Sequence, residues 1–328
     1  MSSAPQPTLV CIGDLVVDLV IAVEELPIAP NRAQNIRAYF IEPGGAGNML
    51  IMAARLGAHA VALGTMGSDE YAQRAYAALA DEGVDLRYVQ RAPGEENVLV
   101  LVVVDDRGEH AFLVREGQGA SFVLTEAVQA LLRHAHLLLV PGYALHERRM
   151  ADAVLPAARI AASANVPILV DPGPVSGEPS VRPALLELLR LSTFVLLTAE
   201  ESLQLSGQSS EEAAAQWLLH QSHGDVVLKL GERGCAVYAR GAAPRRFPAP
   251  RVAMRDTSGA GDVFDAVFAV EWWRTRDPYR AAQRANRYAA YKVTQLGTGR
   301  RCPPGVLPTG WADDETQDDH ILSQGEHM

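Results

Sequence analysis

The chain has 328 residues, of which 48% are hydrophobic and 21% charged, an ordinary composition for a globular protein with a substantial core. No apolar run approaches the roughly 18 residues of a membrane span, and no basic stripe with interleaved aromatic residues indicates nucleic-acid binding. The formal charge is −10, but residues 307–328 hold six acidic side chains and no Lys or Arg. We therefore expect a folded domain at residues 1–306 and an acidic, disordered tail. Cys11, Cys235 and Cys302 are isolated, which disfavours disulfides and zinc and favours a reducing cytoplasm.

Short apolar runs alternate with helical patterns along most of the chain. The segment at 9–23 opens as a strand, residues 48–57 predict a helix that ends at Gly57, and residues 60–67 predict a second strand. Four later runs of similar length, separated mostly by stretches rich in Ala and Leu, are HLLLV, PILVD, FVLLT and VVLKLG. Because short apolar runs between helices are typical of strands buried on both faces, we predict an α/β fold with a mostly parallel central sheet sandwiched by helices.

Two segments break this alternation. Residues 24–45 are punctuated by proline and predict extended chain without a helix. Residues 97–114 predict a β-hairpin that turns around residues 105–108. Because both segments fall outside the helix–strand pattern, we expect them to form a small antiparallel sheet that stands apart from the parallel core.

The stretch RDTSGAGDVFDAVFAV, residues 255–270, places small residues in a turn before a helix that begins near Gly261. Gly259, Ala260 and Gly261 lack bulk, so their N–H groups can converge at the helix N-terminus, where unsatisfied donors and the helix dipole favour an anion. Asp262 follows in the first turn, and a carboxylate beside a phosphate site can take a proton from an attacking hydroxyl. The plainer alternative is an N-capping aspartate after a glycine turn. No Walker A or dinucleotide fingerprint is present, which excludes a plain dehydrogenase.

DTSGAGD, together with PGGAGNMLIMAARLGA near the N-terminus, resembles the two signatures of the ribokinase-like (PfkB) carbohydrate kinases. The resemblance runs from about Leu9 to Pro304. It implies a ribokinase-like fold with a β-sheet lid formed by about 16–42 and 96–118. It also implies transfer of the γ-phosphoryl group of MgATP to a sugar hydroxyl, with the small-residue turn as the anion hole and Asp262 as the catalytic base.

The same resemblance assigns residues to the acceptor. Asp18 matches the family aspartate that binds sugar hydroxyls, as a carboxylate at the end of the first strand can do, and Asp14 is a second candidate. Gly44 and Gly45 resemble the hinge glycines of the lid, and Asn48 resembles the substrate-contacting amide. Asn48 comes one residue earlier than in most ribokinases and fructokinases, a spacing similar to that of heptose-phosphate kinases. A strand-end surface aspartate and an asparagine at a helix start are the structural alternatives.

Further matches concern the nucleotide and its ions. Glu201 matches the glutamate that tunes the magnesium–phosphate network, although Thr198 stands where the family usually has asparagine. Asp256 matches a monovalent-cation ligand of some relatives, whose other ligands would be backbone carbonyls near 294–299, so K+ activation is one option. Asp171 follows a strand and suits a structural or a metal-network role. The candidate nucleotide-binding residues are Lys229, Gly231, Gly234, Thr257 and Asn286.

Alternatives to a sugar kinase stay open. One is a nucleoside kinase or a sugar-phosphate kinase of the same fold; a phosphorylated acceptor needs cations near the lid, and four arginines lie in suitable segments, Arg32, Arg37, Arg107 and Arg115. Another is a sugar-binding or regulatory protein without turnover, which the intact Asp262 loop disfavours. We expect ATP and a small acceptor as partners, and exposed edges of the lid offer a surface for a homodimer.

Overall fold

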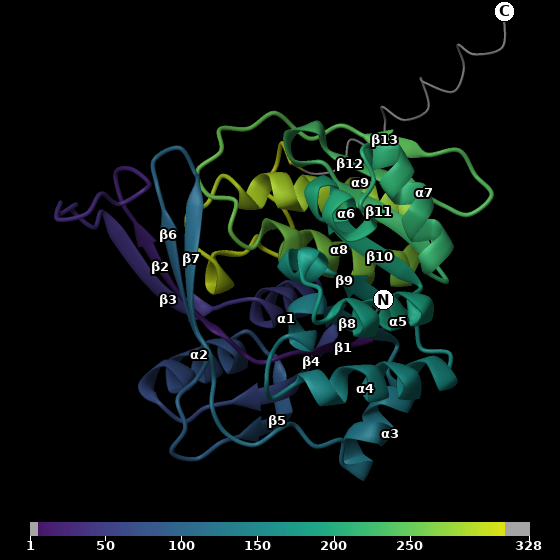
Figure 1. Cartoon of the computed structure of the whole chain (residues 1–328), viewed down its shortest axis with the longest axis horizontal. Helices are drawn as coiled ribbons and strands as arrows, with labels where there is room; N and C mark the ends of the chain where they lie inside the picture. Colours follow the sequence, from purple (N-terminus) through teal and green to yellow (C-terminus); the bar gives the residue numbers. More distant parts are fainter. Residues whose placement is uncertain (1–5, 312–328) are drawn as a thin grey trace, which may run out of the picture.

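The computed structural model describes residues 6–311 of the chain (Figure 1). In this part, nine strands form one large sheet in the order β13-β12-β11-β10-β9-β8-β1-β4-β5. All neighbouring pairs from β11 to β5 are parallel, and only β12 and β13 run antiparallel to their neighbours. The predicted mostly parallel α/β fold is therefore confirmed. The bounds of these strands are β1 (Thr8–Ile12), β4 (His59–Met66), β5 (Asp85–Arg91), β8 (Leu137–Pro141), β9 (Ile168–Asp171), β10 (Phe194–Thr198), β11 (Asp225–Lys229), β12 (Cys235–Tyr238) and β13 (Arg245–Phe247).

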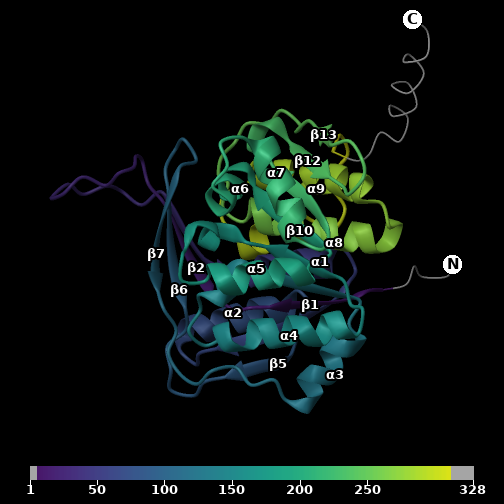
Figure 2. The same cartoon turned by 45° about the vertical axis from the view of Figure 1, so that its right-hand side comes forward.

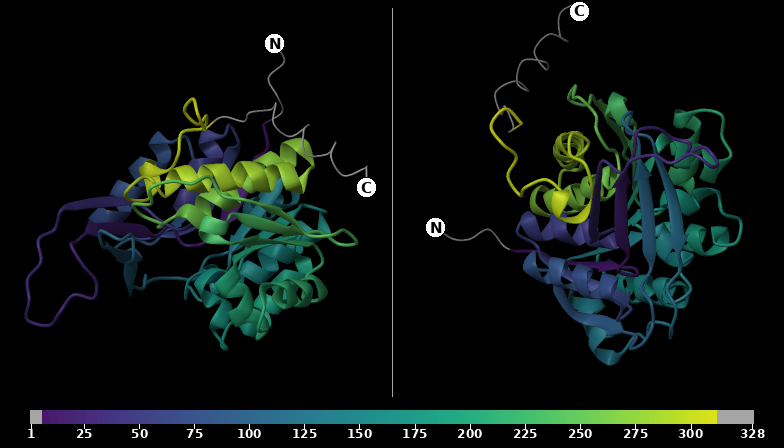
Figure 3. Two further views of the ribbon diagram at one scale, coloured as in Figure 1. Left: turned by 90° about the horizontal axis from the view of Figure 1, so that it is seen from above. Right: turned by 90° about the vertical axis from the view of Figure 1, so that its left-hand side faces the viewer.

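Helices cover both faces of this sheet (Figures 2 and 3). Successive side chains of a strand point to opposite faces, so Leu9 and Cys11 pack with α1, α2, α8 and α9, whereas Val10 and Ile12 pack with α3 to α7. Their bounds are α1 (Ala46–Arg55), α2 (Glu70–Asp81), α3 (Glu126–His134), α4 (Ala151–Ser163), α5 (Arg182–Leu191), α6 (Ala199–Ser206), α7 (Glu211–Gln221), α8 (Ala260–Thr275) and α9 (Pro278–Lys292). Within residues 6–311, no helix has the length and apolarity that a bilayer crossing requires.

A separate four-stranded sheet stands beside the main body, at the left of Figure 1. Its order is β3-β2-β6-β7, and its strands are β2 (Val17–Ala22), β3 (Ala38–Pro43), β6 (Leu99–Val104) and β7 (His110–Arg115). The predicted hairpin is confirmed, since β6 and β7 pair antiparallel. The expectation of a wholly antiparallel sheet is wrong, because the central strands β2 and β6 run parallel. Both follow parallel strands of the large sheet, β1 and β5, so the chain enters the small sheet twice in the same direction.

The first predicted strand is in fact two strands in two different sheets. β1 ends at Ile12, and β2 begins at Val17 after a four-residue link. Asp18 is consequently the second residue of β2 and does not end the first strand, as the sequence had suggested. The apolar pattern runs on through the link because Leu15 and Val16 are also buried, so hydrophobicity alone gives no signal for the change of sheet.

The packed structure extends past the domain boundary predicted at residue 306. Leu307 is buried, and the Trp311 ring packs edge-on against Tyr291 with 5.1 Å between the ring centroids. Residues 312–328 of the predicted tail lie outside the described residues.

Candidate active site

A cavity of about 580 Å³ lies between the small sheet and the loops that follow β1 and β8. The small sheet and its flanks give it an apolar wall, whose residues are Val98, Val100, Val102, Phe112 and Val114. The lining also includes most of the predicted acceptor and catalytic residues, namely Asp14, Asp18, Gly45, Asn48, Gly259 and Asp262. An apolar wall facing a few convergent polar groups is typical of small-molecule sites.

Asp262 lies in the first turn of α8, and a second buried side chain fixes its orientation. Its Oδ2 accepts a hydrogen bond of 2.7 Å from Asn48 Nδ2, and Asn48 Oδ1 accepts the Gly299 N–H at 2.6 Å. Asn48, predicted from the sequence to contact the substrate, thus connects the carboxylate to the loop after α9. Burial raises the pKa of Asp262 to about 6, although the Asn48 hydrogen bond opposes this shift. A carboxylate with that pKa is suited to act as a base near neutral pH.

Asp18 projects from β2 into the cavity. Its Oδ2 accepts a hydrogen bond of 2.9 Å from the Thr298 hydroxyl, and burial raises its pKa to about 7. Gly44 packs directly on this carboxylate, since a Cβ at residue 44 would overlap it. Gly45 has φ of +48°, and a Cβ there would overlap the Tyr143 hydroxyl, which accepts the Ala46 N–H. Neither of the two predicted hinge glycines can therefore carry a side chain, because Asp18 and Tyr143 lie too close to them.

A Gly44→Ala variant is expected to weaken acceptor binding selectively. The added methyl group must displace the Asp18 carboxylate, because the two would overlap. We expect KM for the acceptor to rise about tenfold or more, with a small change in KM for ATP, since one buried charged hydrogen-bonding group is worth roughly 1.5–3 kcal/mol. Steady-state kinetics with each substrate varied in turn measures both constants. An equal rise of both KM values would contradict the placement of Asp18 on the acceptor.

The pH dependence of kcat/KM is expected to follow the two raised carboxyl pKa values. As the predicted base, Asp262 would act only when ionised, so activity is expected above its pKa of about 6 and is expected to fall as the pH drops through that value. Asp18, with a pKa of about 7, adds a second acidic-side ionisation. An Asp18→Asn variant should remove that upper step and leave the lower one. An acidic limb below pH 5 in the wild type would contradict this assignment.

Asp14 lines the cavity and belongs to a network of polar groups. Its carboxylate accepts hydrogen bonds from the Thr65 hydroxyl and from Arg149 Nε at 3.0 Å, and its N–H donates to Glu147 Oε2 at 2.8 Å. Burial and the charge of Asp14 raise the pKa of Glu147 to about 8. Sequence reasoning missed Tyr143, Glu147 and Arg149. The available signal was their position directly after a buried strand, where polar residues of parallel sheets form sites.

The N-terminus of α8 has the geometry of an anion site. Gly259 is left-handed at φ of +73°, and Asp256 accepts the Ser258 N–H at 2.8 Å, which holds the turn. The Ala260 N–H donates to the Thr257 carbonyl at 3.1 Å, whereas no residue among 6–311 accepts the N–H of Gly261. A Cβ on Gly261 would lie 3.4 Å from Lys229 Nζ. The free N–H of Gly261 and an ammonium group therefore lie together at this helix end, whereas the predicted Ala260 donor is engaged.

Lys229, at the end of β11, forms a buried ionic cluster behind that turn. Its Nζ lies 3.0 Å from Asp171 Oδ2 and 3.2 Å from both carboxylate oxygens of Asp265. Burial opposes the charge of Lys229, but Asp171 and Asp265 raise its pKa above the usual value. Asp265 was not among the sequence predictions, since it reads as part of the apolar helix that surrounds it.

Glu201 is the predicted residue of the magnesium network. Its Oε2 accepts the Thr198 N–H at 2.7 Å, and its own N–H donates to Thr198 Oγ1 at 3.2 Å, so the two residues form a capping box of α6. Burial and the nearby charge of Asp171 raise the pKa of Glu201. Carboxylate oxygens suit Mg²⁺, and these two acids fit an ion held mainly by phosphates and water. No cluster of three or more metal-ligating side chains occurs in residues 6–311.

The other predicted nucleotide residues lie outside the cavity lining. Gly231 and Gly234 form the turn after β11; a Cβ would meet open space at Gly231 and would overlap the Phe247 carbonyl at Gly234. Asn286 Nδ2 donates to the Pro248 carbonyl at 2.8 Å, so its amide ties α9 to the segment after β13. Thr257 Oγ1 lies 3.2 Å from His110 Nδ1 at the start of β7. This contact links residues 256–259, the turn before α8 that we call the anion turn, to the small sheet.

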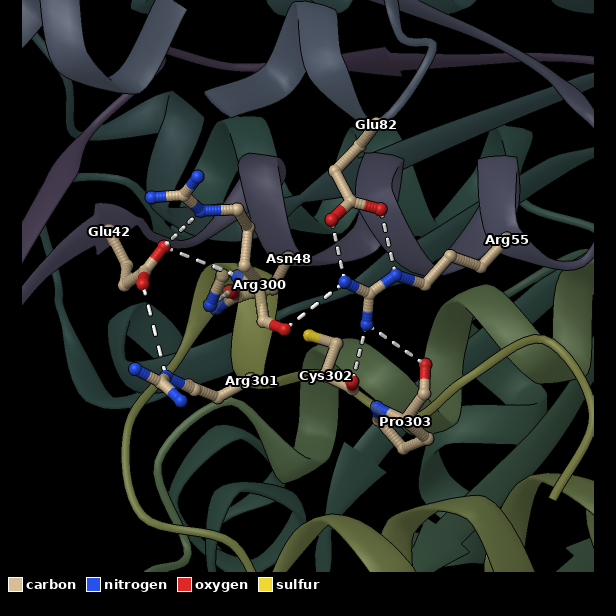
Figure 4. Close-up of polar contacts among 9 residues, drawn as sticks. Glu42, Asn48, Arg55, Glu82, Arg300, Arg301, Cys302 and Pro303 are labelled. Carbon is tan, nitrogen blue, oxygen red and sulfur yellow. Dashed lines mark hydrogen bonds and ion pairs between the residues drawn. The ribbon is translucent and has the colours of Figure 1, made fainter. Parts of the chain in front are cut away.

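Polar contacts from α1 and β3 hold the segment of residues 297–303, which follows α9 (Figure 4). Arg55 pairs with both oxygens of Glu82 and donates to three carbonyls of the segment, which belong to Arg300, Cys302 and Pro303. Glu42, in β3, accepts from Arg300 Nε at 3.2 Å. These contacts hold the segment whose Thr298 and Gly299 bind Asp18 and Asn48.

Comparisons with known proteins agree with this fold. Arabidopsis thaliana ribokinase, solved with ribose and ATP, superposes with a TM-score of 0.77 at 23% identity, covering 92% of this chain and 97% of that structure. Adenosine kinase from Sinorhizobium meliloti gives a TM-score of 0.79 at 21% identity and coverages of 90% and 96%. The fold is therefore the ribokinase-like fold expected from the sequence.

The sequence comparisons identify the family. The model of the pfkB family carbohydrate kinases matches residues 6–304, so the chain belongs to this family. Bifunctional protein HldE of Azorhizobium caulinodans is 29% identical over 302 residues, covering 88% of this chain and 61% of that protein. Fructokinase-1 of Oryza sativa is 29% identical over 269 residues, with coverages of 78% and 80%. The chain spans about three fifths of the length of its HldE relatives. The predicted class, an ATP-dependent phosphotransferase with an alcohol acceptor, is the class of this family.

Proposed function

We propose that the protein transfers the γ-phosphoryl group of MgATP to a hydroxyl of a sugar bound in the cavity beneath the small sheet. The observation that carries this proposal is the position of Asp262. Its carboxylate lines the same cavity as Asp18 and lies in the first turn of α8, next to the N–H of Gly261. A base and an anion site are thus adjacent, as transfer between two bound substrates requires.

Each group then has a defined role. Asp18 orients the acceptor through its hydroxyls, and Asp262, held by Asn48, accepts the proton of the attacking hydroxyl. The donors at the α8 N-terminus stabilise the charge that develops on the transferred group. Lys229 adds a fixed positive charge behind the turn, while Asp171 and Glu201 would hold the hydrated Mg²⁺ that neutralises the phosphates. The apolar lid wall excludes water, the competing acceptor.

The charges of the cavity favour a neutral acceptor. The four arginines considered as phosphate clamps are all paired with carboxylates, and none lines the cavity; the pairs are Arg32–Glu25, Arg37–Asp106, Arg107–Asp105 and Arg115–Asp69. Acidic groups predominate in the lining, which contains Asp14, Asp18, Glu116, Glu147 and Asp262. A phosphate close to the ionised members of this group would be repelled. We therefore propose an unphosphorylated sugar as the acceptor.

A sugar phosphate is the second candidate, and one observation favours it. Arg148 lines the cavity, is exposed, and makes no hydrogen bond or ion pair with any residue in the described part of the chain. An acceptor long enough to place its phosphate at Arg148 would avoid the acidic side.

Acceptor-dependent ADP formation across neutral ketoses, aldoses, sugar phosphates and nucleosides tests both candidates. We expect turnover with one neutral sugar and little effect of Arg148→Ala on its KM. Preferential turnover of a phosphorylated sugar, with a marked KM increase in Arg148→Ala, would favour the second candidate. If no acceptor is turned over but a sugar still raises Tm, the protein is a binding protein on this fold and the proposal fails.

The homodimer expected from the sequence is also a proposal. Tyr39 in β3 and Leu113 in β7 are 65% and 63% exposed, and both belong to the small sheet. A second copy covering that face would remove these apolar side chains from water. Light scattering during size-exclusion chromatography measures the mass, and a monomer at all concentrations would contradict the proposal.

A further inference from the structure

Lys292, the last residue of α9, is a fully buried lysine that the proposed chemistry does not use directly. Its Nζ donates to the Gln295 carbonyl at 3.4 Å, within the segment 294–299 where the sequence had placed carbonyl ligands of a monovalent cation. Burying an ammonium group is costly unless nearby groups compensate its charge. The surroundings of Lys292 must therefore be suited to a cation.

Asp256, the other predicted cation ligand, is completely buried, and its charge acts on Lys292. Its Oδ1 accepts the Ser258 N–H at 2.8 Å and its Oδ2 accepts the Gly297 N–H at 2.7 Å. This carboxylate thus ties the anion turn to the loop after α9. Each of its oxygens already has a protein partner, but its negative charge still requires a counter-charge in this dry region.

Carbonyls of the same loop are also bonded within the chain. The Val293 carbonyl accepts the N–H of Arg255 and of Asp256 at 2.8 and 3.2 Å. The Gln295 carbonyl accepts from Lys292, and Arg55 takes the carbonyls of Arg300, Cys302 and Pro303 (Figure 4). Lys292 and Arg55 thus donate hydrogen bonds to four carbonyls of the segment that follows α9.

The charge of Lys292 also reaches the proposed base. Burial lowers its pKa from the usual value, while the carboxylates of Asp256 and Asp262 act in the opposite direction. In turn, the Lys292 charge lowers the pKa of Asp262. A positive charge at this place therefore favours the ionised form of Asp262.

We propose that Lys292 supplies, from within the chain, the positive charge that a bound monovalent cation would otherwise provide between the Asp256 turn and the loop after α9. The residues present do not fit an additional K+ at this place, because a second cation would face an ammonium in a buried site. The catalytic consequence of this proposal rests on the proposed kinase function. The expected lack of a K+ effect on Tm can be tested without turnover.

Thermal denaturation tests the site without turnover. Wild-type protein is compared in KCl and in tetramethylammonium chloride at equal ionic strength, alongside Lys292→Gln and Lys292→Met. We expect the same Tm in both salts for the wild type, and a Tm about 2–4 °C higher in KCl for a variant that has opened a cation site. A K+-specific rise in the wild type would overturn the proposal, as would folded variants that respond to neither salt. If both variants fail to fold, the wild-type comparison still decides whether the site takes K+.

Kinetics then test the consequence for catalysis. We expect wild-type kcat to change less than about twofold between the two salts, and kcat of Lys292→Gln to fall at least about tenfold without K+ and to recover partly with it. Strong K+ activation of the wild type would overturn the proposal. Absence of turnover under every condition would instead contradict the proposed kinase function, while the thermal result would still stand.

Discussion

Asp262→Asn is expected to lower kcat by at least about a hundredfold, the scale of a general base in proton transfer. The amide cannot accept the proton of the attacking hydroxyl, whereas its size matches that of the carboxylate. Asn48 Nδ2, which donates to Asp262 at 2.7 Å, keeps a carbonyl oxygen as acceptor, so the local structure should be retained. The measurement is acceptor-dependent ADP formation at pH 8, above the Asp262 pKa of about 6.

Two controls make this result specific. Asp81→Asn, at the exposed end of α2, is the same chemical change away from the site and should leave kcat unaltered. Asp262→Asn should also bind ATP with nearly wild-type affinity, because the α8 N–H donors and Lys229 are unchanged. Loss of less than about tenfold in kcat would assign the base to another residue.

Arg149→Met is expected to cost about 3–5 kcal/mol of unfolding free energy, because it removes one partner of a buried ion pair. Arg149 and Asp14 are 1% and 2% exposed, and Arg149 Nη2 lies 2.9 Å from Asp14 Oδ2. Arg149 Nη1 also donates to the Gln118 carbonyl at 3.0 Å. Without Arg149 the Asp14 carboxylate would have only the Thr65 hydroxyl to compensate it. Urea denaturation at pH 7 measures the difference.

The double variant Asp14→Asn/Arg149→Met separates the ion pair from packing. With both charges removed, no unpaired charge remains, and the double variant should be clearly more stable than Arg149→Met alone. Arg74→Met is the matched control, since its ion pair with Glu70 is exposed and should contribute less than about 1 kcal/mol. If the double variant is as unstable as the single one, the lost stability comes from the aliphatic part of Arg149 and not from its charge.

The elements that depend on local pattern could be predicted from the sequence. The apolar runs at β8 to β11 are fully buried between helices, and this two-sided burial made them recognisable. The anion turn was also recognisable, since Gly259 adopts the left-handed conformation that glycine favours. The hairpin of β6 and β7 followed from its two β-rich arms and the polar turn at residues 105–108.

Features that depend on which segments meet in space could not be predicted. The parallel pairing of β2 and β6 is set by where the chain leaves the large sheet, and the position of Asp18 in the small sheet follows from the same change. Asn48 gives no local signal that its two partners are Asp262 and the Gly299 N–H, far apart in the chain. The sequence likewise gives no sign that Arg149 is buried, because its burial depends on the ion pair with Asp14.

The most direct test of the account is a crystal structure with a non-hydrolysable ATP analogue, Mg²⁺ and the acceptor identified by turnover. The account predicts an acceptor hydroxyl about 2.6–3.2 Å from the Asp262 carboxylate, a second hydroxyl on Asp18, and the γ-phosphate facing the Gly261 N–H. An acceptor bound outside the cavity, or a γ-phosphate remote from the α8 N-terminus, would contradict it.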